Sequence, residues 1–247
     1  MPAIREGEVH LSYAADDVRD ERLLAKYRSL LTSEERLRHD RFRSERDQRR
    51  YLVTRALVRW VLSQHAGVAP EEFVFSTNAW GKPEIRKPSG LALRFNASNT
   101  RGMVACVVAL AHDVGVDVED TTRPGETGHL AERFFSKPEL EALRALPAEL
   151  QRERFFDYWT LKEAYVKGRG LGLSLPLHKF AIKLEPMSDP TVVVEPEVDD
   201  GARWQLGLTR PTAAHRLASA VCLGVGPPLT LFLHSVVPFA GEPSLEG

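Results

Sequence analysis

Cysteine is scarce in this sequence, which has only two cysteines among its 247 residues, Cys106 and Cys222. Each stands in a hydrophobic run typical of a buried strand, so we expect two buried free thiols rather than a disulfide framework. The eight histidines are scattered and form no His-x-x-x-His or His-Glu-x-x-His motif, and no Cys-x-x-Cys motif occurs. These absences argue against a dedicated zinc site.

Long hydrophobic runs are absent as well. The longest, Met103 to Ala111, has nine residues, whereas a helix that spans a membrane needs about 20. The first residues are charged and contain no apolar segment typical of a secretory signal. We therefore expect a cytoplasmic protein with no membrane partner.

Neither sign of charge is in excess. The chain has 33 Lys and Arg residues against 34 Asp and Glu residues, a formal net charge of −1, which argues against binding nucleic acid through bulk charge. The balance hides a local excess, because Glu21 to Trp60 contains twelve basic residues against six acidic ones. This segment is a candidate for binding anions.

The length and the 43 % hydrophobic content fit one large domain or two small ones. Apolar residues at helical spacing predict a helix from about Ser44 to Ala66, and another is expected from Ala148 to Lys167. Short apolar runs broken by Pro, Asp and Gly indicate an antiparallel meander over residues 180–233.

The chain contains a faint internal repeat. Val9-x-Leu11-x-Tyr13 resembles Val114-x-Val116-x-Val118 at an offset of 105 residues, and residues 55–59 resemble residues 163–167 at an offset of 108. Two matches at nearly one offset suggest duplicated halves, although chance explains them equally well.

Two carboxylates in one short strand form the first candidate site. In Gly115-Val116-Asp117-Val118-Glu119, residues two apart share a face, so Asp117 and Glu119 project together while the valines enter the core. Repulsion between the carboxylates favours a divalent cation, and oxygen-only ligands favour Mg²⁺. The alternative is a solvated edge strand in which the acids only prevent aggregation.

The second candidate site lies in the helix expected to end near residue 167. Trp159, Glu163 and Lys167 are spaced four residues apart and therefore share one stripe of that helix. Glu163 would complete a Mg²⁺ site or act as a base. The alternative is an ordinary Glu–Lys pair that stabilises the helix by a few tenths of a kcal/mol.

A polar segment and a lysine turn form the third candidate site. Residues 95–100, Phe-Asn-Ala-Ser-Asn-Thr, are expected to form a loop whose N–H groups and side chains bind phosphate. Gly81-Lys82-Pro83 and the arginine-rich helix would add positive charge nearby. Such segments are often only turns, which is the alternative.

The order of the motifs is more specific than any one of them. It runs basic helix, Trp-Gly-Lys-Pro, Phe-Asn-x-Ser, Gly-Val-Asp-Val-Glu, Phe-Phe-Ser-x-x-Glu, Trp-x-x-Lys-Glu-Ala-x-x-Lys-Gly. This order, over residues 36–177, closely resembles the 4′-phosphopantetheinyl transferases of the Sfp type. The resemblance implies transfer of the phosphopantetheine arm of coenzyme A to a serine of an apo acyl or peptidyl carrier protein. Such carriers serve fatty acid, polyketide and nonribosomal peptide synthesis, and adenosine 3′,5′-bisphosphate is released.

The resemblance also implies roles for individual residues. Asp117, Glu119 and Glu163 would hold Mg²⁺, or Mn²⁺, at the coenzyme A pyrophosphate. Lys167 would steady the leaving group, and Glu163 would accept the serine proton directly or through a water. Contacts with coenzyme A are implied for Lys82, Ser98, Asn99, Lys162, Arg38 and Arg50. The family usually has histidine where this chain has Asn99, which cannot carry charge, so we expect altered coenzyme A affinity or pH dependence.

The fold implied is α+β, with two similar halves in a pseudo-twofold arrangement and the active site in the cleft between them. We expect a first half at residues 1–112 that contacts coenzyme A and a flexible tail at residues 237–247. The second half, residues 113–236, would carry the metal site, the catalytic helix and the carrier-docking face. That face is expected to include Phe134, Phe135, Lys137 and Leu140. Two fused halves complete one site, so a monomer is expected.

Two other classes of function remain open on the sequence. Asp-x-Glu on a strand followed by a lysine-bearing helix also fits a Mg²⁺-dependent phosphodiesterase or nuclease. Such an enzyme would need a basic channel long enough for DNA, and the second half is not rich in arginine. The other is a non-catalytic module that holds a nucleotide or a carrier domain. The presence of Asp117, Glu119, Glu163 and Lys167 together argues against that alternative.

Overall fold

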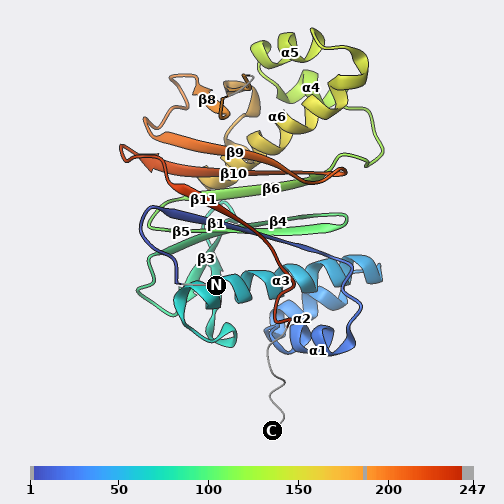
Figure 1. Ribbon diagram of the computed structural model, residues 1–247, viewed down its shortest axis with the longest axis vertical. Coiled ribbons are helices and arrows are strands. Elements are labelled where there is room, and N and C mark those ends of the chain that lie inside the picture. Colours follow the sequence, from blue (N-terminus) through green and yellow to red (C-terminus); the bar gives the residue numbers. More distant parts are fainter. Residues whose placement is uncertain (1–2, 186–187, 241–247) are drawn as a thin grey trace.

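The computed structural model describes residues 3–185 and 188–240. Its layers follow one another as helices, sheet, sheet and helices (Figure 1). The first half contains β1 (Glu8–Ala15), α1 (Glu21–Ser29), α2 (Ser33–Asp40), α3 (Glu45–Ala66), η1 (Pro70–Glu72), β2 (Val74–Thr77), β3 (Pro83–Lys87), β4 (Leu93–Thr100) and β5 (Met103–Leu110). The second contains β6 (Val114–Asp120), α4 (Gly128–Phe134), α5 (Lys137–Arg144), α6 (Ala148–Arg169), η2 (Gly172–Ser174), η3 (Leu177–Lys179), β7 (Phe180–Lys183), β8 (Thr191–Val194), β9 (Arg203–Thr212) and β10 (His215–Gly224). The last strand is β11 (Thr230–Ser235).

The two halves repeat one topology. Strands β1, β5 and β4 pair in that order, as do β6, β10 and β9, and each half adds a separate hairpin, β2–β3 or β7–β8. The long helices α3 and α6 both have 22 residues and end at a glycine in the left-handed conformation, Gly67 and Gly170. A glycine ends a helix in this way without the penalty that a Cβ would carry. The α+β fold of two similar halves is therefore confirmed.

The last strand, β11, does not belong to the sheet of the second half. β11 pairs in parallel with β1, from Glu8 opposite Thr230 to Tyr13 opposite Ser235. Residues 230–235 thus join the sheet of the first half, which differs from the predicted division at residue 236 and from the predicted single meander. A period-two pattern marks a strand but does not show which open sheet edge the strand will join.

Residues 237–240, which we expected to belong to a tail, are packed against the first half. Phe239 is buried, and its ring centroid lies 6.1 Å from that of Tyr27. The Tyr27 hydroxyl donates a hydrogen bond to the Pro238 carbonyl at 2.8 Å. The rest of the predicted tail, residues 241–247, lies outside the described residues.

Three apolar clusters form the core. One joins α3 to the first sheet, a second joins α6 to the second sheet, and a third lies between the sheets and includes Leu11, Val116, Val118 and Leu217. Both cysteines are free, but only Cys106 is buried, and Cys222 is partly exposed. No helix in the described ranges has the length and apolar character needed to cross a membrane.

A row of side chains joins the two sheets at the edge of β6. Residues 95–100, expected as a loop, belong to strand β4, and alternate polar side chains of β4 accept hydrogen bonds from alternate backbone N–H groups of β6. The pairs are Asn96 with Val116 (3.0 Å), Ser98 with Val118 (3.4 Å) and Thr100 with Asp120 (3.2 Å). The polar side chains of this segment therefore accept hydrogen bonds from backbone N–H groups at the edge of β6, which otherwise would lack partners.

Replacement of Asn96 by Leu tests this row. The substitution keeps the approximate side-chain size but leaves the buried Val116 N–H without its acceptor. We expect the free energy of unfolding to fall by about 1–3 kcal/mol, measured by urea denaturation. Asn99 is exposed on the same strand, and its replacement by Ala should change the value by less than about 0.5 kcal/mol. Equal stability of the Asn96 variant and the parent chain would contradict this account of the edge.

Candidate active site

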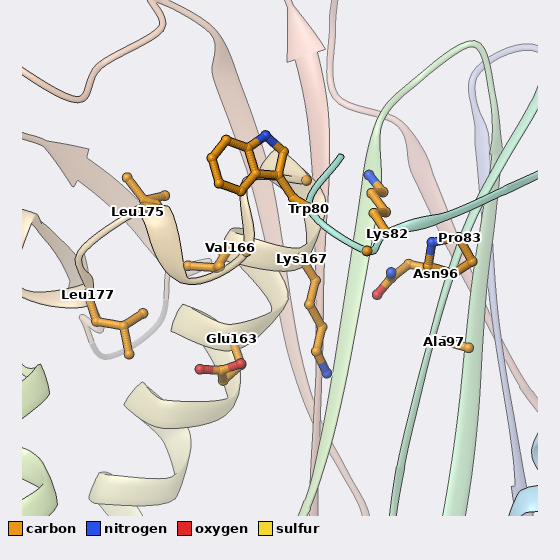
Figure 2. Close-up of a pocket in the computed structure, with 13 residues that line it drawn as sticks. Trp80, Lys82, Pro83, Asn96, Ala97, Glu163, Val166, Lys167, Leu175 and Leu177 are labelled. Carbon is orange, nitrogen blue, oxygen red and sulfur yellow. The ribbon is translucent and has the colours of Figure 1, made fainter. Parts of the chain in front are cut away.

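A cleft of about 280 Å³ lies between the two halves. The first half contributes the turn that carries Trp80 and Lys82 and part of β4, and the second contributes α6 and the segment after it (Figure 2). Its lining comprises Trp80, Gly81, Lys82, Pro83, Asn96, Ala97, Glu163, Val166, Lys167, Gly170, Gly172, Leu175 and Leu177. Figure 2 shows the Glu163 and Lys167 side chains extending from one face of α6.

Close contact between β6 and α6 positions these side chains. A Cβ atom on Gly115 would lie 2.0 Å from the carbonyl oxygen of Ala164 and 2.3 Å from the amide nitrogen of Gly168. Only glycine at residue 115 therefore allows the helix to lie directly on the strand. The contact places the face of α6 that carries Glu163 beside the acidic face of β6.

Asp117 lies at the centre of a buried polar network. Its Oδ1 accepts hydrogen bonds from Lys167 Nζ at 2.5 Å and from Ser98 Oγ at 2.9 Å. Lys167 Nζ also donates to Ser98 Oγ at 2.9 Å. Among the described residues, Asp117 Oδ2 is buried and has no hydrogen-bond partner. One carboxylate oxygen is therefore neutralised, and the other has unused acceptor capacity.

Glu119 is held by two groups outside the cleft lining. Its Oε1 accepts a hydrogen bond from Trp159 Nε1 at 2.9 Å, and its Oε2 lies 3.5 Å from Arg123 Nε. Burial, followed by the charge of Asp117, raises the pKa of Glu119 to about 7. Burial and the same charge also raise the pKa of Glu163, whereas Lys167 lowers it. The charge of Asp117 therefore disfavours the charged forms of both Glu119 and Glu163.

The donor set fits a hard divalent cation. Asp117 Oδ2 is buried without a hydrogen-bond partner, and Asp117 repels both Glu119 and Glu163. A bound cation would compensate both features. Carboxylate oxygens without His or Cys nearby match the preference of Mg²⁺. Within residues 3–185 and 188–240, however, no three acidic, His or Cys side chains are already gathered closely enough to hold a metal ion.

Lys82 joins the two halves at the rim of the cleft. Its Nζ donates a hydrogen bond to the Gly168 carbonyl at 2.8 Å and lies 3.8 Å from Asp113 Oδ1. Asn78, in the same turn, donates from Nδ2 to the Gly170 carbonyl at 3.1 Å. Burial lowers the pKa of Lys82. The turn thus holds the carboxyl end of α6, and the lysine lies where a ligand in the cleft would meet it.

Lys162 does not lie in the cleft, although it is next to Glu163 in sequence. The side chain is fully buried, and its Nζ donates to both carboxylate oxygens of Glu139 and to the Phe180 carbonyl. All three donors of the ammonium group are therefore used. This geometry corrects the predicted contact with coenzyme A, and we do not propose Lys162 as a ligand of that molecule.

The other predicted coenzyme A contacts are spread around the cleft. Arg38 lines a second cavity, of about 1060 Å³, and Pro83 lines both cavities. Arg50 is outside the lining of both cavities and forms an ion pair with Asp47. Asn99 is exposed on β4, whereas Ser98 is buried and its hydroxyl belongs to the Asp117 network. The structure thus brings together Asp117, Glu163 and Lys167, with Glu119 beside them.

Sequence reasoning missed three features of the site. It did not identify Trp159 and Arg123 as the partners of Glu119, or the need for glycine at residue 115. The four-residue spacing from Trp159 to Glu163 was a usable signal, since it places the indole on the face of α6 that meets β6. No comparable signal links Arg123 to Glu119 beyond their own four-residue separation on a strand and loop.

Comparison with known proteins matches both halves of the chain. Residues 113–222 match the family model of the 4′-phosphopantetheinyl transferase superfamily, and residues 20–112 match the model of the 4′-phosphopantetheinyl transferase N-terminal region. The 4′-phosphopantetheinyl transferase psf-1 of Bacillus pumilus is 30 % identical over 218 residues, covering 84 % of this chain and 91 % of that protein. The 4′-phosphopantetheinyl transferase Sfp of Bacillus subtilis is 35 % identical over 159 residues, covering 64 % and 69 %.

The comparison with solved structures finds a holo-(acyl-carrier-protein) synthase from Bacillus anthracis. It is 17 % identical, has a TM-score of 0.39, and the match covers 44 % of this chain and 94 % of that one. The chain belongs to the 4′-phosphopantetheinyl transferase superfamily, as an Sfp-type member.

Proposed function

We propose that this chain transfers the 4′-phosphopantetheine arm of coenzyme A to a serine hydroxyl of an apo carrier protein. Adenosine 3′,5′-bisphosphate is the second product. The observation that supports this function is the network of Asp117, Ser98 and Lys167, which lies beside Glu163 where the two halves meet. The membership of the transferase superfamily supports the same reaction.

The acidic groups are proposed to hold a divalent cation. Asp117, Glu119 and Glu163 supply the carboxylates, and the unpaired Asp117 Oδ2 is a free acceptor among them. Bound Mg²⁺, or Mn²⁺, would neutralise charge on the coenzyme A pyrophosphate. Trp159 keeps the Glu119 carboxylate oriented toward this group of acids through its 2.9 Å hydrogen bond.

The reacting groups are then assigned as follows. The serine oxygen of the carrier attacks the β-phosphorus, the bond from that phosphorus to the nucleotide oxygen breaks, and Glu163 accepts the serine proton. Lys167, held by Ser98 and Asp117, supplies positive charge to the departing oxygen. Positioning and charge neutralisation dominate phosphoryl transfer, so fixed charges suit this reaction.

The remaining assignments are also proposals. We assign contacts with coenzyme A to Lys82, Ser98, Asn99, Arg38 and Arg50. We assign the cavity that Arg38 lines to the nucleotide end of that molecule. A monomeric state, a cytoplasmic location and carrier docking beside α4 and α5 stay predictions. Of the expected docking residues, Phe135 is buried against Phe155, with ring centroids 5.2 Å apart. Phe134, Lys137 and Leu140 are more accessible.

The test of the function is mass spectrometry on a panel of apo carrier proteins. Incubation with the chain, coenzyme A and Mg²⁺ should add about 340 Da, the covalent mass of the phosphopantetheine group, to the carriers it serves. The panel should include fatty acid, polyketide and nonribosomal peptide carriers. If no carrier gains this mass, the proposed function is wrong. Cleavage of DNA under the same conditions would instead support a phosphodiesterase.

Removal of divalent cations should stop the reaction. Dialysis against EDTA is expected to lower the initial rate of carrier modification at least about 100-fold, because the pyrophosphate charge would face the carboxylates directly. Added Mg²⁺ or Mn²⁺ should restore the rate. Circular dichroism before and after dialysis serves as the control for folding. A folded, cation-free chain with an unchanged rate would contradict the metal assignment.

A further inference from the structure

A buried ion pair lies behind the cleft, one residue from the proposed base. Glu139 of α5 and Lys162 of α6 have 1 % and 0 % of their side chains exposed. Lys162 Nζ lies 2.8 Å from Glu139 Oε1 and 2.7 Å from Oε2. Neither residue lines the cleft, and the mechanism above does not use them.

The pair is joined to three elements of the second half. Glu139 Oε1 also accepts from the Ile182 N–H, and Oε2 accepts from both the N–H and the hydroxyl of Ser136. The third donor of Lys162 bonds to the Phe180 carbonyl at 2.7 Å. The start of α5, the middle of α6 and strand β7 therefore meet at this one pair.

Attraction between the two charges does not by itself account for such a pair. Burial lowers the pKa of Lys162 to about 8, which shows the cost of placing the ammonium group there. Buried ion pairs can often be replaced by apolar residues of similar size without loss of stability, because desolvation offsets the attraction between the charges. The pair does fix the rotation of α6 about its own axis, since the hydrogen bonds of Glu139 and Lys162 can all form at only one such rotation.

That rotation matters for the cleft. Consecutive helix residues point about 100° apart, so fixing Lys162 toward α5 and β7 fixes Glu163 toward the cleft. Lys167 follows on the same face of α6 as Glu163 (Figure 2). Apolar contacts elsewhere on α6 are not directional and do not by themselves fix its rotation. The hydrogen-bonded ion pair is directional. β7 also follows directly on the segment that carries Leu175 and Leu177, which line the cleft.

We propose that Glu139 and Lys162 are positioning residues that set the rotation of α6 and thereby aim Glu163 and Lys167 at the reacting phosphate. The inference rests on the proposed function, because it assigns the roles of Glu163 and Lys167 to carrier modification. It predicts that the pair affects the chemical step rather than the binding of coenzyme A.

The test replaces both charges at once, with Glu139→Met and Lys162→Met in one chain. We expect the kcat for carrier modification, per folded molecule, to fall about 10- to 100-fold. The unfolding midpoint should also fall, because the Ile182 N–H, the Ser136 N–H and the Phe180 carbonyl lose their partners. The KM for coenzyme A should change less than about threefold. The matched control is Lys179→Met with Glu195→Met, an exposed ion pair of 2.7 Å in the same half, for which no change is expected.

The outcomes separate the two hypotheses. If the parent chain modifies no carrier, the proposed function itself fails. If the parent is active and the double variant keeps its kcat, or loses activity through KM alone, the positioning role is overturned. A lower unfolding midpoint with normal kcat per folded molecule would show a merely structural pair and overturn it too.

A second variant decides the case in which the double variant does not fold. Ser136→Ala removes one hydrogen bond to Glu139 Oε2 and leaves both charges in place. It should fold, with kcat lowered about threefold and the KM for coenzyme A unchanged. A kcat equal to that of the parent chain would overturn the proposal in that case.

Discussion

Replacement of Glu163 by Gln is expected to lower the single-turnover rate of phosphopantetheine transfer by about 10²- to 10⁴-fold, the range for loss of a general base. The amide keeps the size of the side chain but cannot accept the serine proton. Coenzyme A binding should persist because Lys82, Lys167 and the cavity lined by Arg38 are unchanged. Rapid-quench measurement of carrier modification gives the rate, and calorimetric titration gives the coenzyme A affinity.

The matched control is Glu149→Gln, an exposed acid in the first turn of the same helix. It removes one charge from α6 far from the cleft and should leave the transfer rate within about twofold of the parent. Near-normal single-turnover transfer by the Glu163 variant would remove Glu163 from the role of base. A selective loss of coenzyme A binding would assign it to ligand binding alone.

Replacement of Gly115 by Ala is expected to have the largest effect on stability. The added Cβ would lie 2.0 Å from a backbone oxygen and 2.3 Å from a backbone nitrogen of α6, and neither can move aside as a flexible side chain could. We expect a loss of more than about 4 kcal/mol, a large part of the 5–15 kcal/mol that stabilises a typical domain. Urea denaturation followed by circular dichroism measures the loss.

Gly128 supplies the comparison for this substitution. It begins α4, and a Cβ there would meet nothing within 4 Å. Gly128→Ala should therefore leave the chain as stable as before or slightly more stable, because Ala favours helix more than Gly does. If the two variants were equally stable, close contact between β6 and α6 would not explain the glycine at residue 115.

Much of the fold could be predicted from the sequence in the segments where apolar residues recur at the spacing of a strand or a helix. The strand with Asp117 and Glu119, and the helix with Glu163 and Lys167, lie where apolar spacing placed them. Strand β4 was mistaken for a loop because its polar residues face another backbone rather than solvent. Burial of that kind depends on the neighbouring strand, which the local sequence does not reveal.

Part of the candidate site was also predictable from residue spacing. Residues four apart on α6 share a face, so Glu163 and Lys167 could be grouped from spacing. Lys162 could not be assigned to a face, because α6 has buried residues on all sides, and a helix buried on all sides shows no polar stripe. Only the position of Glu139 shows that Lys162 points away from the cleft.

The pairing of β11 with β1 has a consequence for the order in which the chain can fold. Tyr13 lies opposite Ser235, so the first half obtains its last strand only after the residues of the second half, up to residue 235, have left the ribosome. Until then, one edge of β1 is open, and an open strand edge favours pairing with other chains. Contacts between such distant residues also form slowly. The two halves repeat one topology, but the sheet of the first half cannot be completed before the second half has been synthesised.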